Sequence, residues 1–264
     1  GGKVVLIHYW SSSSPTTKSD HETIADLHKK YGGAKFDVIV GHLFYGLHRH
    51  VPGATRYVTM MRHPLPRILS SYAYMGQRGR KNSHLYATDQ MPWATHLENR
   101  RDDIRQLSRI VGGDDTQIRQ FRIHDLPENA TDVAIEHLEN DFAMVGLQEH
   151  YDASLLMMRY ILNWTQPITY IRLNESKRRI KLDDLSLADQ KLVKQAAEVE
   201  MPVYEYAKKR FEAQKEAYPG DIERDVAQFR ADNERYAQRQ ALITRIKTPF
   251  RAVRRSIRRL RSGK

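Results

Sequence analysis

An arginine and a serine beside a predicted helix start are the residues with the clearest potential for chemistry. Arg62 follows a short apolar run, Tyr57 to Met61, and Ser70 lies eight residues further along the chain. A guanidinium group donates two parallel hydrogen bonds to a phosphate, and a serine hydroxyl adds a third. The pair therefore predicts a phosphate grip. An ordinary amphipathic helix with Arg62 in a surface ion pair fits the spacing equally well.

The helix after Arg62 is predicted from a proline and from the spacing of its apolar residues. Pro64 suits a helix start, where its missing N–H leaves no hydrogen bond unmade. We expect the helix over residues 65–75 and a polar, basic loop over residues 76–84. One side of the helix should face the core and the other a ligand. The apolar side comprises Leu65, Ile68, Leu69 and Tyr72, and the polar side Arg67, Ser70 and Ser71.

Short apolar runs alternate with helical patterns along the first part of the chain. Strands are predicted over residues 3–10, 36–40 and 57–61, with a helix over residues 20–31. This order predicts a parallel, doubly wound α/β sheet, in which ligands bind at the carboxyl ends of the strands. His42 and Arg62 both follow such ends, so we expect them at one edge of the sheet.

The rest of the chain predicts mostly helices. They are expected over residues 93–110, 131–140, 151–163 and 203–214, with a short strand over residues 168–173. Ser186 and Asp189 have the spacing of a capping box at another helix start. Pro219-Gly220 is the clearest boundary. We therefore assign residues 1–218 to an α/β domain and residues 219–264 to a helical, basic extension.

The net charge of +11 is concentrated at the end of the chain. Residues 245–264 hold nine Lys or Arg and no acid, which leaves about +2 on the preceding residues. A basic amphipathic helix suits an anionic membrane surface or a polyanion, whereas the near-balanced body gives no support for nucleic-acid binding. Residues 222–243 have heptad-like apolar spacing, so this helix either pairs with a second copy or packs on its own domain.

Composition also restricts where and how the protein acts. The sequence contains no cysteine, which excludes disulfides and thiolate chemistry and favours a reducing compartment. No stretch reaches the run of about 20 apolar residues that a membrane-spanning helix needs, and no signal peptide or metal-ligand cluster is visible. We expect a cytoplasmic protein, peripheral to the membrane if the basic helix binds lipid.

Five stretches of the sequence carry a family resemblance. They are Gly41–His48, Tyr57–Tyr72, Asp103–Ser108, Val145–Leu155 and Val203–Phe211. Together they resemble the carbohydrate sulfotransferase family that includes the heparan sulfate 2-O-sulfotransferases, especially its bacterial members, over about residues 1–214. The resemblance implies a P-loop-type parallel sheet flanked by helices. It also implies 3′-phosphoadenosine 5′-phosphosulfate (PAPS) as donor, no metal, and a hydroxyl of a glycan or related molecule as acceptor.

The resemblance implies roles for single residues as well. Arg62 and Ser70 match the pair that binds the 3′-phosphate of the donor. His42 matches the general base, which must take the proton of the acceptor hydroxyl as this hydroxyl attacks sulfur. In some relatives a second histidine lies two residues before the base, where this sequence has Val40. Arg67 matches an arginine that forms a structural ion pair.

The binding of the donor's 5′ end is where the sequence departs from the family. Members carry a Pro-Lys-Thr-Gly-Gly-Thr loop after the first strand, and this loop is missing here. Either the Ser-rich residues 11–18 replace it, with Lys18 contacting the donor, or the loop precedes Gly1. We favour the second explanation, which predicts weak donor binding and little turnover. Lys177 and Arg178 match a loop that closes over the donor, although solvated basic side chains fit equally well.

A function from another class also fits the sequence. The protein would then be noncatalytic, with the same nucleotide fold, and would bind an anionic surface or polyanion through residues 245–264. A P-loop kinase is not supported, because the sequence lacks Gly-x-x-x-x-Gly-Lys-Ser/Thr.

Overall fold

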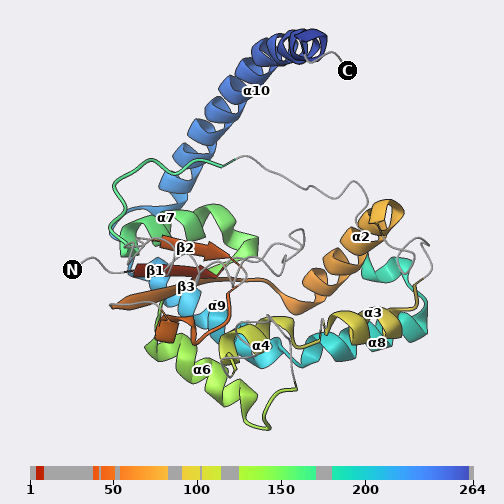
Figure 1. Cartoon of the computed structure of the whole chain (residues 1–264). Coiled ribbons are helices and arrows are strands. Elements are labelled where there is room, and N and C mark those ends of the chain that lie inside the picture. Colours follow the sequence, from red (N-terminus) through yellow and green to blue (C-terminus); the bar gives the residue numbers. More distant parts are fainter. Residues whose placement is uncertain are drawn as a thin grey trace.

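The computed structural model describes residues 4–8, 38–41, 43–50, 54–82, 91–101, 103–113, 125–170 and 180–261. Its four-stranded sheet has the order β2-β1-β3-β4, and all strand pairs are parallel (Figure 1). The strands are β1 (Val4–His8), β2 (Val38–Gly41), β3 (Thr55–Met61) and β4 (Phe142–Leu147). In the register, Leu6 lies opposite Ile39 and Tyr57, and Thr59 lies opposite Val145. The α/β class and the parallel sheet expected from the sequence are confirmed.

Helices surround this sheet. They are α2 (Pro64–Asn82), α3 (Trp93–Arg100), α4 (Arg105–Val111), α6 (Ala130–Asn140), α7 (Tyr151–Ile161), α8 (Leu187–Glu198), α9 (Met201–Glu216) and α10 (Ile222–Arg261), with short 3-10 helices η1 (Leu47–His50), η2 (Gln148–His150) and η3 (Leu182–Asp184). α7 and α9 both pack on β4, and α10 packs on α7. Figure 1 shows α2, α3 and α8 together at one side of the sheet. Among the described helices, none has both the length and the apolar character that crossing a bilayer requires.

Two apolar clusters hold these elements. The larger one joins the sheet to α4, α6, α7, α9 and the start of α10, and Met144 and Phe211 are among its fully buried members. The smaller one lies between α2, α3 and α8 and consists of Ile68, Leu69, Trp93, Leu97, Val193 and Ala197. The turn from β3 into α2 therefore connects two separately packed regions.

Helix α2 is longer than the sequence predicts, and its polar side is less exposed. The loop expected over residues 76–84 is wrong as far as Asn82, because the helix continues to that residue. Gln, Arg and Lys between residues 77 and 81 favour helix strongly enough to outweigh two glycines. Arg67 and Ser71, expected on the open side of the helix, are buried, whereas Ser70 is only partly buried.

Other boundaries also differ from the predicted ones. The single helix expected over residues 93–110 is two helices, because Arg101 adopts a left-handed conformation with φ 46° after α3. β4 was not expected as a strand. Residues 168–170 are not in a strand, and the rest of the strand predicted there lies outside the described residues, as does the helix predicted over residues 20–31.

Two predicted helix features are confirmed. Ser186 caps α8, because its Oγ accepts a hydrogen bond from the Asp189 amide at 3.2 Å. α10 continues past Pro249 to Arg261, so the residues with heptad-like spacing and the basic segment share one helix. Its first turns pack on their own domain, where Ile222, Val226 and Phe229 belong to the larger core.

Candidate functional site

The turn between β3 and α2 has the strand–turn–helix form that the sequence predicts. Residues 57–61 of β3 are buried, and Pro64 begins α2. Arg62 is partly buried at the carboxyl end of the strand, and Ser70 is partly buried on the helix. Ser70 lies six positions after Pro64 in the helix, a rise of about 9 Å along the axis. The structure thus carries both residues on one β3–α2 unit.

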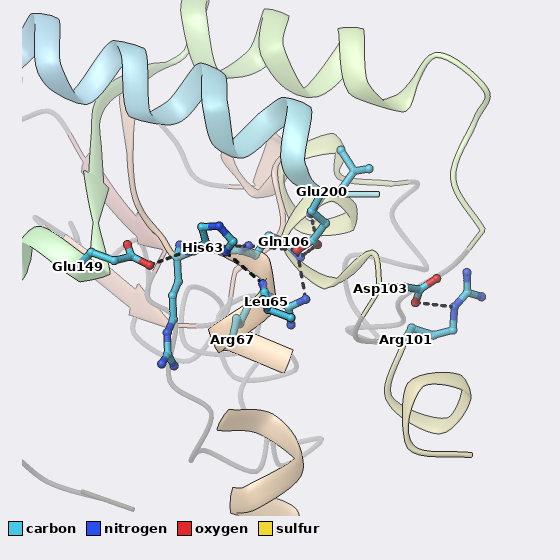
Figure 2. A network of polar contacts seen from close by, with 10 residues as sticks. His63, Leu65, Arg67, Arg101, Asp103, Gln106, Glu149 and Glu200 are labelled. Atoms are coloured by element: carbon cyan, nitrogen blue, oxygen red, sulfur yellow. Dashed lines mark hydrogen bonds and ion pairs between the residues drawn. The ribbon is translucent and has the colours of Figure 1, made fainter. Parts of the chain in front are cut away.

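Side chains from distant elements fix the main chain of this turn (Figure 2). The Arg62 amide donates to Gln106 Oε1 at 2.9 Å, and Gln106 Nε2 donates back to the Arg62 carbonyl at 2.9 Å. The next amide, of His63, donates to Glu149 Oε1 at 2.7 Å. Gln106 lies on α4 and Glu149 on η2, so two successive amides of the turn are held from two different elements.

His63 serves as the N-cap of α2. Its ring Nδ1 accepts a hydrogen bond from the Leu65 amide at 3.2 Å, which satisfies one of the amides that a helix start leaves unpaired. The neutral ring therefore carries its proton on Nε2. Residue type alone indicates this role only weakly, because Ser, Thr, Asp and Asn are the usual caps.

A buried carboxylate, that of Glu200, contacts both α2 and α4 next to the turn. Glu200 is 1% exposed and accepts hydrogen bonds from the Gln106 amide, the Leu107 amide at 3.0 Å and Gln106 Nε2 at 3.0 Å. Both amides belong to the first turn of α4, where a negative charge is favourable. Arg67 pairs with the same carboxylate at 3.1 Å and is buried as well. The structural ion pair expected for Arg67 is therefore confirmed.

Tyr204 on α9 is a further titratable group beside the turn. Its ring centroid lies 5.1 Å from that of His63. Burial, together with the carboxylates of Glu149 and Glu205, raises the pKa of Tyr204 to about 12. The phenol is therefore neutral at physiological pH and adds no charge to the turn.

The other predicted site residues are not among those that the structure describes: His42, Lys18, Lys177 and Arg178. The described ends of β2 and β3, at Gly41 and Met61, lie at the same edge of the parallel sheet with β1 between them. Val40, where some relatives have a second histidine, is 62% exposed. Within the described residues, no three His, Asp or Glu side chains are grouped to hold a metal ion.

Sequence reasoning missed the residues that support the turn. Gln106 and Glu149 both fall within stretches that carry the family resemblance, but no role was assigned to either. Glu200 lies directly before α9, outside the helix expected over residues 203–214. Nothing in the local pattern links these residues to Arg62, since their contacts span 44 and 94 residues of chain.

Comparison with known proteins supports a carbohydrate sulfotransferase family, and the family it identifies differs from the heparan sulfate 2-O-sulfotransferases that the sequence resembles. The family model for galactose-3-O-sulfotransferase matches residues 25–247, from before β2 into α10. No curated protein matches the chain. Because the family model covers most of the sequence, including the β3–α2 turn, the chain belongs to the galactose-3-O-sulfotransferase family.

Proposed function

We propose that the protein transfers a sulfonate group from PAPS to a hydroxyl of a glycan or related acceptor. Membership of the family supports sulfonate transfer at a general level. The observation that carries the proposal is the turn from β3 into α2, where Gln106 hydrogen-bonds to both the amide and the carbonyl of Arg62. An arginine with a fixed main chain, followed by a serine on the next helix, suits the 3′-phosphate that distinguishes PAPS from ATP.

In the proposed reaction, the acceptor oxygen bonds to sulfur as the bond from sulfur to the 5′-phosphate oxygen breaks. The acceptor proton passes to His42, and adenosine 3′,5′-bisphosphate leaves. Arg62 and Ser70 bind the 3′-phosphate throughout the step, which positions the donor. Lys177 and Arg178 supply positive charge to the donor phosphates, and Lys18 does so if residues 11–18 form the loop for the 5′ end.

The acceptor is the least constrained part of the proposal. The family description points to the 3-hydroxyl of galactose, whereas the sequence resemblance extends to heparan sulfate 2-O-sulfotransferases. We therefore propose a glycan hydroxyl as the shared chemistry. Incubating the protein with radiolabelled PAPS and either galactose-terminated oligosaccharides or desulfated heparan sulfate separates the two, because only the true acceptor gains label.

His42→Ala tests the central step. We expect this variant to bind adenosine 3′,5′-bisphosphate like the parent protein while turnover falls by at least about 100-fold, since a general base contributes this much or more. Calorimetry and label transfer measure the two quantities. Unchanged turnover would remove His42 from the mechanism. A parent protein that binds neither the bisphosphate nor PAPS would favour the noncatalytic alternative.

Variants of the basic residues test donor binding. Lys18→Ala should remove most activity if residues 11–18 substitute for the missing loop, and an unaffected variant rules that role out. Lys177→Ala and Arg178→Ala should each raise the KM for PAPS if these residues bind donor phosphates. Unchanged kinetic constants would indicate solvated side chains.

A further inference from the structure

Gln106 uses both ends of its side-chain amide to hold Arg62, a residue of the proposed site. The side chain is fully buried. Its Oε1 accepts from the Arg62 amide and its Nε2 donates to the Arg62 carbonyl, each at 2.9 Å. The second N–H of Nε2 is directed to Glu200 Oε2 at 3.0 Å. Both amide hydrogens and the carbonyl oxygen therefore have partners.

Glu200 determines which way this amide faces. A carboxylate only accepts hydrogen bonds, so the nitrogen and not the oxygen of Gln106 must point to it. This leaves Oε1 for the Arg62 amide. Glu200 is itself fixed by Arg67 and by the amides of Gln106 and Leu107 (Figure 2). The chain of contacts runs from a buried ion pair, through one amide, to the main chain of the candidate phosphate-binding residue.

We propose that Gln106 is a positioning residue for the 3′-phosphate grip, and that Glu200 orients it. This inference rests on the proposed role of Arg62 in binding that phosphate. A bidentate arginine–phosphate contact needs the guanidinium within a fraction of an ångström of its place, and the direction of an arginine side chain starts from its main chain. Gln106 holds that main chain at both its amide and its carbonyl.

Gln214 provides a matched control, because it makes the same kind of clamp elsewhere. Its Oε1 accepts from the Val145 amide and its Nε2 donates to the Ala143 carbonyl, both at 3.1 Å. These residues belong to β4, where Val145 lies opposite Thr59 of β3. A methionine keeps a side chain of similar length. It removes these two hydrogen bonds at Gln214 and three at Gln106, where the bond to Glu200 is lost as well.

The experiment measures the affinities of adenosine 3′,5′-bisphosphate and adenosine 5′-phosphate by calorimetry. The ratio of the two affinities reports the 3′-phosphate contact alone. We expect Gln106→Met to lower this ratio about tenfold, as expected for a contact that loses one charged hydrogen bond. Gln214→Met should lower thermal stability to a comparable degree and leave the ratio within about twofold, because a general loss of stability does not act on one phosphate.

A double variant decides whether Gln106 acts through Arg62. Arg62→Ala should itself remove most of the preference for the bisphosphate. Adding Gln106→Met should then change the affinity ratio no further. An additional loss in the double variant would overturn the proposal, as would an unchanged ratio in Gln106→Met alone. If the parent protein shows no preference for the bisphosphate, the proposed function fails and the positioning role falls with it.

Gln106→Asn is a second variant that tests the proposal if Gln106→Met does not fold. It keeps a polar amide near Glu200 but is one methylene too short to reach both groups of Arg62. Circular dichroism establishes folding of each variant. A folded Gln106→Asn protein with the parent ratio overturns the proposal, and a lowered ratio supports it.

Discussion

At Arg62 the geometry of the charge matters as much as its sign. Arg62→Lys keeps the positive charge but replaces the planar fork with a single ammonium group. We expect the affinity for adenosine 3′,5′-bisphosphate to fall about tenfold, the difference between a bidentate and a single charged contact. The affinity for adenosine 5′-phosphate should stay unchanged. Calorimetry of both ligands tests this, and equal losses for both would contradict a 3′-phosphate contact.

The ion pair between Arg67 and Glu200 should contribute strongly to the free energy of unfolding, because it joins the elements next to the turn. Both side chains are almost fully buried. Arg67→Met leaves the Glu200 carboxylate without its counter-charge, and breaking a buried pair in this way costs about 3–5 kcal/mol. Urea denaturation measures the loss in the free energy of unfolding.

Replacing both partners of this pair should be less harmful than the sum of the single changes. In the double variant Arg67→Met with Glu200→Gln, no unpaired charge remains buried, and an amide oxygen can still accept from the first turn of α4. We expect the double variant to be at least about 1 kcal/mol more stable than Arg67→Met alone. A double variant less stable than Arg67→Met would show that the carboxylate acts mainly by capping α4.

The sequence predicts those parts of the site that depend on local spacing. Arg62 and Ser70 follow from a strand, a proline and a helical stripe, all within a short stretch. The supporting residues Gln106, Glu149 and Glu200 could not be predicted in this way, because their contacts with the turn are set by the packing of distant elements. The resemblance identified the stretches that contain two of them but not what they contact.

At the scale of elements, the same packing explains the boundaries that the sequence missed. Local apolar spacing continues from α3 into α4 and predicts one helix. In the structure, α4 begins where Glu200 accepts hydrogen bonds from the amides of Gln106 and Leu107, groups that a continuous helix would have paired internally. The carboxylate of Glu200, the residue before α9, thus sets the start of α4, which no pattern within residues 93–110 could reveal.

A buried carboxylate, that of Asp152, links helix α10 to helix α7. Asp152 on α7 accepts from the Tyr170 hydroxyl at 2.7 Å and from Arg230 Nε of α10 at 2.6 Å. The Tyr170 amide donates to Asn233 of α10 at 2.8 Å. These bonds tie Tyr170 to both helices.

Asp152→Ala should loosen this junction. The Asp152 side chain is only 7% exposed, and its removal leaves the Tyr170 hydroxyl without this acceptor. We expect a loss of about 2–4 kcal/mol in the free energy of unfolding. Hydrogen exchange at residues 165–170 should also become faster. Exchange at the parent rate would show that α10 does not hold this segment.

A surface pair on the same helix is the control for that variant. Arg235 and Asp232 pair at 3.1 Å, with side chains 69% and 55% exposed. Asp232→Ala should cost less than about 1 kcal/mol, because exposed pairs of this kind contribute little. Exchange at residues 165–170 should keep its parent rate.

Across the whole molecule, α10 has two parts with different surroundings. Its first turns share the core of the sheet, through Ile222, Val226 and Phe229. The rest of the helix extends away from the body (Figure 1), and the family match stops at residue 247. The concentrated basic charge begins at residue 245, close to where that match ends. The charged end is thus separated in space from the β3–α2 turn.

The basic end should attach the protein to anionic membranes. Residues 245–264 carry nine Lys or Arg, and Phe250, Val253, Ile257 and Leu260 recur at helical spacing. Each basic residue near an anionic surface contributes about 1 kcal/mol, screened by salt over about 8 Å at physiological ionic strength. We expect flotation with phosphatidylserine vesicles, none with phosphatidylcholine vesicles, and release at high salt.

Deleting residues 245–264 separates this role from the proposed site. The shortened protein keeps the buried turns of α10 and the Asp152 junction, so it should bind adenosine 3′,5′-bisphosphate like the full chain while flotation is lost. Equal flotation of the two proteins excludes membrane binding by this segment. If the full chain instead binds heparin but not vesicles, the same charge serves a polyanion, and the shortened protein should then sulfate polyanionic acceptors with a raised KM.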